Sequence, residues 1–306
     1  MHFAQTLVRT ALVATLWAIA LPVTAHAAKP TSTADDRPGP GPVTEASAHY
    51  DLEQLYGNAQ IKEGLAKARE QLAANPSDPA LYRHVIRFLF EIGELVHRED
   101  TSMDKEALYQ EMLDLCNKAL ELDPGNAHTL FNRGIATGRL ATTHGVLASL
   151  GNLKSIEQDW LAAANAPYKY ESLAGAEHLP CDTYLTLGIF YRVVPDYWIV
   201  QLLAGTRGDI DKSIAWLEKS NACQADRIRT LKELGVSRLC AGTRNKDPVR
   251  TATGKQVLSY LQTLPKSHTH SELDKAHAQM LIEDPSLACE YSRDGQQDLD
   301  EKNIKH

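Results

Sequence analysis

A short pattern recurs three times along this chain and restricts the folds that it can adopt. Two side chains lie three residues apart, a glycine follows at once, and a fourth residue comes three positions later. The copies are Leu130, Arg133, Gly134 and Thr137; Tyr184, Leu187, Gly188 and Tyr191; and Leu231, Leu234, Gly235 and Arg238. This spacing places all four residues on one face of an α-helix. Each glycine predicts a point where a second helix approaches so closely that a side chain would push it away.

The apolar spacing is helical along almost the whole chain, and no segment alternates for long enough to predict a strand. Apolar residues at helical spacing run from Tyr50 to Ala74, and another helix is expected from Pro79 through Val96. A third is expected over 103–122, after which Asp123, Pro124, Gly125 and Asn126 end it. Pro79 suits a first helical turn because its missing N–H is not needed there. The sequence therefore predicts an all-α fold.

A turn followed by an amphipathic helix spans Gly205 to Ser220, with Asp209 placed to cap the helix. Small residues recur in this helix at fixed spacing. An earlier copy of the same pattern has its last part at residues 117–126. The matching positions are Ser213, Leu217, Ser220 and Ala225 in the later copy, and Met112, Cys116, Ala119 and Pro124 in the earlier one. With the glycine pattern, these residues resemble the tetratricopeptide repeat over roughly Leu52 to Leu239. That resemblance implies a tetratricopeptide-like helical-hairpin superhelix, here with a central helical insertion, that binds partners through its concave face.

A narrower resemblance is carried by residues 188–195, which read GIFYRVVP, followed by residues 208–213, which read GDIDKS. They are similar to the periplasmic T-component family of tripartite (TRAP-type) transporters and to the regulator-of-microtubule-dynamics repeat proteins. The first of these implies an accessory protein that binds a small-molecule solute for a transporter.

The N-terminus indicates the compartment. Arg9 precedes an apolar run over 11–23, and Ala25 and Ala27 supply the small residues that signal peptidase reads. The run is shorter than the ~20 residues that span a bilayer, although an uncleaved anchor is the alternative. We expect a periplasmic or secreted protein, cleaved near Ala27. The expected organisation is a signal peptide over 1–27, a disordered linker over 28–45 rich in Pro and Gly, a helical-repeat domain over 46–295 and a flexible tail over 296–306.

The charge of the chain disfavours two classes of partner. Its formal net charge is −7 at pH 7, and no stripe of basic residues is present. Nucleic acids and anionic membrane surfaces are therefore poor candidates. No stable membrane insertion is expected of the cleaved chain.

Aromatic residues gather in the central insertion, between Trp160 and Trp198. The segment from Tyr197 to Leu203 is apolar around most of its circumference, with Asp196 a candidate N-cap and Gly205 a candidate end. A helix of this kind is either buried as core or binds something. The binding hypothesis assigns a pocket or groove to Tyr191, Arg192, Tyr197, Trp198 and Arg207. The alternative for the two arginines is solvent exposure or a structural ion pair with Asp196 or Asp209.

The five cysteines lie in a chain that we expect to enter an oxidising compartment. Cys181 precedes a first helix and Cys223 follows its antiparallel partner, so a disulfide between them is feasible. Cys240 lies too far along the next helix to reach Cys223, and its pairing with Cys289 remains a possibility. Cys116 lies on the packed face of its helix and is expected to be a free, buried thiol.

No pattern in the sequence indicates an enzyme. His270, Asp274 and His277 recur at helical spacing and are weak candidates for a metal face, with a polar helix start as the alternative. No nucleophile elbow, phosphate loop or dinucleotide fingerprint occurs, and no cofactor is expected. The leading hypothesis is a periplasmic helical-repeat protein that binds an envelope protein or peptide without catalysis. The alternative is a small-molecule-binding accessory protein of a solute transporter, with an aromatic-lined pocket.

Overall fold

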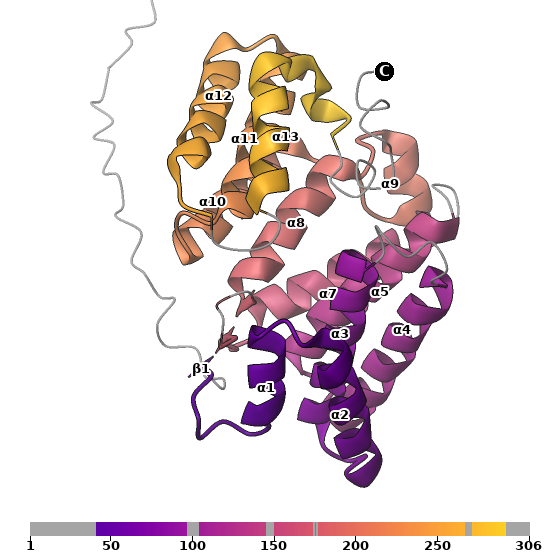
Figure 1. Ribbon diagram of the computed structural model, residues 1–306. Helices are drawn as coiled ribbons and strands as arrows, with labels where there is room; N and C mark the ends of the chain where they lie inside the picture. Colours follow the sequence, from indigo (N-terminus) through magenta and orange to yellow (C-terminus); the bar gives the residue numbers. More distant parts are fainter. Residues whose placement is uncertain are drawn as a thin grey trace, which may run out of the picture. The chain divides into compact units, whose positions relative to one another are not determined.

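The computed structural model describes residues 41–96, 104–144, 150–173, 175, 177–266 and 271–291. The predicted signal peptide over 1–27, most of the predicted linker and the predicted tail over 296–306 lie outside these residues. The fold is an all-α helical-repeat superhelix, as predicted (Figure 1). Among the residues that the structure describes, no helix combines the length and the apolar character that crossing a bilayer requires.

The N-terminal helices differ from the prediction at one point. The elements are α1 (Tyr50–Gly57), α2 (Ile61–Ala74), α3 (Pro79–Glu91), the π-helical turn η2 (Ile92–Val96) and α4 (Lys105–Leu122). The apolar spacing from Tyr50 to Ala74 suggested one continuous helix, but Ala59 takes a left-handed φ of 59° between α1 and α2. Pro79 opens α3 as predicted, and the carboxylate of Asp78 caps it by accepting from the Ala80 N–H.

The rest of the chain continues as packed helices. They are α5 (Ala127–His144), the 3₁₀ turn η3 (Leu150–Asn152), α7 (Leu153–Asn165), α8 (Cys181–Val193), α9 (Trp198–Ala204), α10 (Ile210–Cys223), α11 (Ile228–Asn245), α12 (Pro248–Thr263), α13 (Ser271–Glu283) and the 3₁₀ turn η4 (Pro285–Cys289). The pairs α2–α3, α4–α5, α8–α10 and α11–α12 are among those that pack together. Asp209 caps α10 as predicted, accepting from two backbone N–H groups.

The three glycines of the recurring pattern lie at close helix contacts, as predicted. A Cβ atom on Gly134 would lie 2.4 Å from Nε1 of Trp160 on α7. One on Gly188 would lie 2.4 Å from Cγ of Leu217, and one on Gly235 would lie 2.3 Å from Cδ2 of Leu258. Atoms cannot approach that closely, so glycine is what permits each pair of helices to pack at this separation.

Three strands of two residues each form a small sheet. Gly41–Pro42 (β1) runs parallel to Tyr170–Glu171 (β2), which pairs antiparallel with His178–Leu179 (β3). The N–H groups of Gly41 and Val43 donate to the carbonyls of Lys169 and Glu171, at 3.2 and 3.0 Å. Residues 41–43 therefore pair with the sheet, at the end of the range that we expected to be a linker. Strands of two residues are too short for an alternating pattern to reveal them.

Two disulfides tie the C-terminal half together. Cys181 is bonded to Cys223, with their Cα atoms 5.5 Å apart. Cys240, on α11, is bonded to Cys289 at the end of η4, which the sequence left as one possibility. Cys116 is free and buried, as expected. Burial raises the pKa of its thiol, so it is protonated at neutral pH and unreactive.

Candidate functional site

Helix α9 has ends that can be traced to the sequence. It begins after Tyr197, whose side chain makes no capping hydrogen bond, so the cap expected from Asp196 is not formed. Instead, the Asp196 carboxylate lies 3.5 Å from Nε of Arg207. Gly205 ends the helix with a left-handed φ of 71°, as predicted. We call residues 195–208 the α9 loop.

Hydrogen bonds to α7, to the end of α8 and within the loop itself fix the two ends of the α9 loop. Asp209 donates its N–H to the Tyr191 carbonyl at 2.8 Å, and Gly208 donates to the Pro195 carbonyl at 3.2 Å. The buried hydroxyl of Thr206 donates to Glu157 at 2.9 Å. A Cβ on Gly208 would lie 2.0 Å from the Val194 carbonyl oxygen. The two ends of the loop are thus closed against α7 and α8, and the loop projects from a fixed base.

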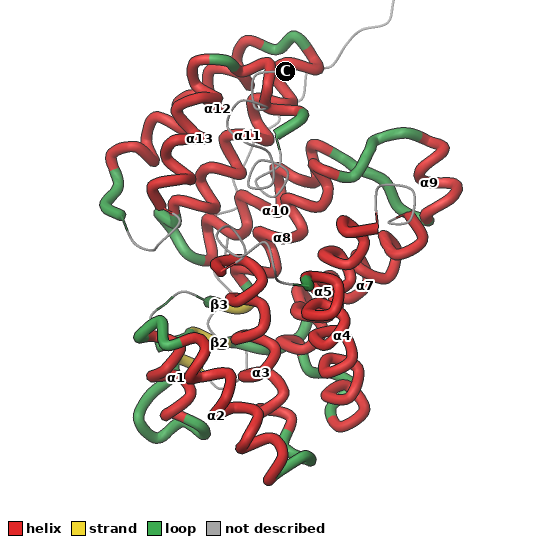
Figure 2. Tube along the Cα trace, turned by 45° about the vertical axis from the view of Figure 1, so that its right-hand side comes forward, coloured by secondary structure: helices red, strands yellow, loops and turns green. Residues whose placement is uncertain are grey.

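Most of the side chains of α9 lie in solvent. Tyr197, Trp198, Leu202 and Leu203 are 67%, 72%, 69% and 66% exposed, and only Val200 and Ala204 of the helix are buried. Figure 2 shows α9 at the periphery of the helices, joined to them by loops on both sides. The core role considered for this helix is therefore limited to its buried edge. A cluster of large apolar side chains in water is unfavourable and is typical of an interaction site.

The structure separates the five residues assigned to the binding hypothesis. Tyr197, Trp198 and Arg207 lie on the α9 loop, with Arg207 half exposed beside Asp196. Tyr191 is buried, and its hydroxyl donates to Glu157 at 2.7 Å. Arg192 is also buried.

The contacts of Arg192 explain why it cannot meet a partner. Its guanidinium donates to the Glu233 carboxylate at 2.6 Å and to the backbone carbonyl of Tyr291. These contacts balance its charge inside the protein, where an unpaired guanidinium would be costly. Arg192 therefore stabilises the folded structure and does not line a binding surface.

The weak metal face is also occupied by internal contacts. Asp274 is buried and accepts from Nζ of Lys232 at 2.7 Å. His277 is buried with Nδ1 3.0 Å from the Tyr291 hydroxyl. His270 lies outside the described residues. Across the described ranges, no group of three or more His, Cys, Asp or Glu side chains is arranged to hold a metal ion.

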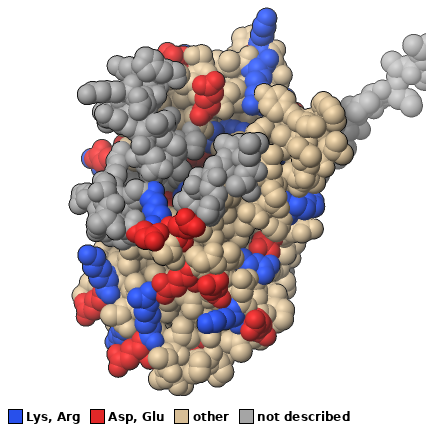
Figure 3. All heavy atoms as spheres, turned by 90° about the vertical axis from the view of Figure 1, so that its right-hand side faces the viewer, with Lys and Arg blue, Asp and Glu red and all other residues tan. Residues whose placement is uncertain are grey.

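Charge does not mark a site on the face that lies to the right in Figure 1. Figure 3 shows acidic and basic side chains interspersed on it, without a stripe of one sign. Helix α9 itself carries no charged residue. The α9 loop is therefore distinguished by its apolar character.

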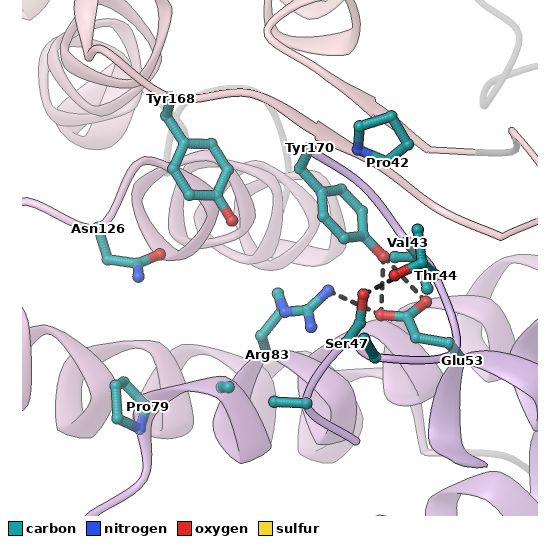
Figure 4. A pocket seen from close by; sticks show the side chains of 13 residues that line it. Pro42, Val43, Thr44, Ser47, Glu53, Pro79, Arg83, Asn126, Tyr168 and Tyr170 are labelled. Carbon is teal, nitrogen blue, oxygen red and sulfur yellow. Dashed lines mark hydrogen bonds and ion pairs between the residues drawn. The ribbon is translucent and has the colours of Figure 1, made fainter. Parts of the chain in front are cut away.

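A second feature, which the sequence reasoning missed, is a pocket of about 560 Å³ beside the small sheet (Figure 4). One wall is the segment that follows β1, and the others come from α1, α3, Asn126 just before α5, and the chain before and within β2. Its lining is Pro42, Val43, Thr44, Ala46, Ser47, Ala48, Glu53, Pro79, Ala80, Arg83, Asn126, Tyr168 and Tyr170. Most of these side chains are apolar or aromatic, with few charged groups, which is the composition typical of small-ligand sites.

The floor of the pocket is a buried charged cluster centred on Glu53. Its carboxylate accepts from Nη1 of Arg83 at 3.0 Å, Nη1 of Arg87 at 2.9 Å and the Tyr170 hydroxyl at 2.9 Å. The guanidinium of Arg83 also lies 4.7 Å from the centre of the Tyr170 ring. Residues from α1, α3 and β2 thus meet here, although Glu53 and Tyr170 are far apart in sequence.

Two histidines lie beneath this floor. Burial is the main cause that lowers the pKa of both His84 and His128, so both are neutral at pH 7. His128 lies 2.6 Å from the Glu177 carboxylate through Nε2. Burial raises the pKa of Glu177, but His128 and the nearby arginines outweigh it and hold that pKa at about 2. The two shifts agree if a neutral His128 donates its Nε2–H to an ionised Glu177.

The signal for this cluster was present in the sequence. His84 and Arg87 occur among Leu81, Val85 and Phe88, so polar groups interrupt the apolar face of a predicted helix. Polar residues on a buried face need partners. Those partners could not be named, because α1 and β2 reach them only through the tertiary fold.

Comparison with known proteins supports the fold. No protein-family model and no curated protein matches the sequence. Among solved structures, the tetratricopeptide-repeat protein TTC0263 of Thermus thermophilus is similar, with a TM-score of 0.52 and 16% identity over 76% of this chain and 97% of that one. PilF of Pseudomonas aeruginosa has a TM-score of 0.43 and 15% identity, over 79% and 87%. The similarity to TTC0263, at so low an identity, shows the fold alone: the chain has a tetratricopeptide-like helical-repeat fold.

Proposed function

We propose that this chain binds a protein partner and that the α9 loop is its contact surface. The observation that carries the proposal is the exposure of Tyr197, Trp198, Leu202 and Leu203 on the short, anchored α9 loop. Trp and Tyr side chains dominate the binding energy of protein interfaces, since they bury large areas at a small entropic cost. The helical-repeat fold supports an interaction role, and no catalytic step is part of the proposal.

The compartment and the kind of partner belong to the same proposal. The signal-like residues 1–27 favour the periplasm or the cell exterior, so the proposed partner is an envelope protein or peptide. Residues 188–195 and 208–213 resemble those of T-components, and on that resemblance we include a transporter component among the proposed partners. The alternative function, a solute-binding accessory protein, is favoured by the pocket lined by Tyr168 and Tyr170, which lies away from the Trp198–Arg207 region where the sequence suggested it.

The experiment compares two exposed apolar positions. Trp198→Ala removes an aromatic side chain from the α9 loop, and Val249→Ala removes an apolar side chain that is similarly exposed, at 69%, on α12. We expect Trp198→Ala to weaken partner binding by about tenfold or more, and Val249→Ala to leave it unchanged. Both variants should alter the free energy of unfolding by less than about 0.5 kcal/mol, because exposed side chains contribute little to stability.

The result can also refute the proposal. Partner binding is measured by surface plasmon resonance against the partner isolated from envelope extract, and stability by thermal melting. If Trp198→Ala binds as tightly as the unmodified chain, the α9 loop is not the contact surface. If it melts much earlier and still binds, Trp198 serves packing.

A further inference from the structure

We propose that the pocket beside the small sheet binds an organic monoanion, a carboxylate on an apolar or aromatic body, with Arg83 as the residue that holds the carboxylate. This site is separate from the α9 loop and does not depend on partner binding there. Figure 4 shows the guanidinium of Arg83 at the pocket floor, with Tyr168 and Asn126 on one side of it and Ser47 and Thr44 on the other.

Arg83 has more hydrogen-bond donors than the protein uses. Its guanidinium carries five N–H bonds. An N–H of Nη1 donates to Glu53 at 3.0 Å, and Nη2 lies 3.0 Å from Nε2 of His84. No described residue accepts from the other three. The side chain is only 13% exposed, so bulk water has limited access to donors that remain available to a ligand.

His84 makes the surplus of donors larger. Its Nε2 faces Arg83 and its Nδ1 lies 3.1 Å from Nη2 of Arg87. A neutral imidazole has one acceptor nitrogen, because the other carries the proton. Only one of the two guanidinium groups can therefore donate to His84. Nε of Arg87 is likewise buried without a partner among the described residues.

Glu53 is the one acidic residue among those that line the pocket, and its carboxylate already has donors, which argues against a cation as the ligand. Nη1 of Arg83, Nη1 of Arg87 and the Tyr170 hydroxyl all donate to it. The Ser47 hydroxyl accepts from the Thr44 N–H at 2.9 Å, which leaves its own O–H to donate. Donors face the pocket, so the complementary ligand is an acceptor with negative charge.

The charge and size of the ligand follow from the same groups. Arg83 already shares its charge with Glu53 at 3.0 Å, so that carboxylate would repel a ligand with two negative charges, such as a phosphate monoester, more strongly than a ligand with one. The volume of about 560 Å³ lies within the usual range for small-ligand pockets. The rings of Tyr168 and Tyr170 and the rings of Pro42 and Pro79 supply apolar walls for a flat body.

The test uses two probes that differ in one charge. N-acetyl-tyrosine carries the carboxylate, and N-acetyl-tyrosinamide is its neutral counterpart. Isothermal titration calorimetry with the full chain should show binding of the acid and at least about tenfold weaker binding of the amide. Phenylacetate and a short peptide ending in tyrosine, titrated in parallel, distinguish a small acid from a peptide C-terminus as the source of the carboxylate, and preference for either one supports the site.

Variants locate the binding. Arg83→Gln should abolish binding of the acid, whereas Arg238→Gln, which removes a guanidinium paired with Glu218 on α10, should leave it unchanged. Because Arg83→Gln also breaks a contact to Glu53, Ala80→Phe provides a second test: it narrows the pocket, whose lining includes Ala80, and keeps every charged residue of the cluster. The proposal is overturned if the acid and the amide bind equally, if neither binds at millimolar concentration, or if folded Arg83→Gln and Ala80→Phe bind the acid like the unmodified chain.

Discussion

Replacing Gly134 by alanine should destabilise the fold, whereas the same change one turn later on α5 should not. A Cβ at position 134 would lie 2.4 Å from Nε1 of Trp160, and that N–H donates to the Phe131 carbonyl at 3.0 Å. A Cβ at position 138 meets no atom within 4 Å. The two substitutions share a helix and the same chemical change, so their difference isolates the cost of the close helix contact.

The magnitude follows from three effects. Overpacking a filled contact costs about 1–3 kcal/mol, and displacing the Trp160 N–H from its acceptor adds about 0.5–1.5 kcal/mol. Alanine recovers about 1 kcal/mol of helix propensity in either position. Gly134→Ala should therefore lower the free energy of unfolding by roughly 0.5–3.5 kcal/mol, and Gly138→Ala should raise it by up to about 1 kcal/mol.

Urea unfolding followed by far-ultraviolet circular dichroism measures both variants. The midpoints are compared at equal slope, since a helical array can lose cooperativity. If Gly134→Ala and Gly138→Ala shift the midpoint in the same direction and by the same amount, α5 and α7 do not pack through Gly134 as described.

Three further predictions follow from the buried groups. Unfolded but unreduced protein should show one thiol per chain with a thiol reagent, namely Cys116, and five would contradict both disulfides. Burial lowers the pKa of His84 and His128 below the value near 6.5 that they have in the unfolded chain, so the unfolded chain binds more protons than the folded one. The free energy of unfolding should therefore fall as the pH drops below 6.5, by at most about 1.4 kcal/mol per pH unit for each histidine. His128→Gln should reduce this pH dependence in melting curves. Asp274→Leu should lower the free energy of unfolding in urea by about 1.5–3 kcal/mol, because buried Lys232 loses one carboxylate partner and keeps Glu233, and a neutral outcome would contradict the buried contact.

The fold could be predicted because its signals are local and repeated. The glycine pattern at Gly134, Gly188 and Gly235 indicates helix packing without any knowledge of the partner helix, and capping residues such as Asp209 mark helix starts. A fourth close contact, where a Cβ on Gly64 would lie 2.2 Å from Phe88, was not predicted. Gly64 lies before the first copy of the recurring pattern and is not part of any copy, so the repetition that predicts the other three contacts does not predict this one.

The candidate sites were predicted less completely, for physical reasons. Apolar side chains around α9 indicate that the helix is either buried or an interaction surface, and composition does not decide between them. The structure excludes a fully buried helix, because Trp198 is 72% exposed. Arg192 and Tyr191 have the residue types of a binding site and serve buried contacts instead. The pocket above Glu53 depends on β2 reaching α1, which is a tertiary contact that no local pattern encodes.

The most direct test of the central claim is site-specific photocrosslinking from the α9 loop. A benzophenone amino acid is placed at Trp198 in one chain and at Val249 in another, and each is irradiated in the envelope of cells that express it. Our account predicts a discrete crosslinked protein from position 198 and none from position 249. Crosslinks of equal yield from both positions, or none from position 198, would contradict partner binding through the α9 loop.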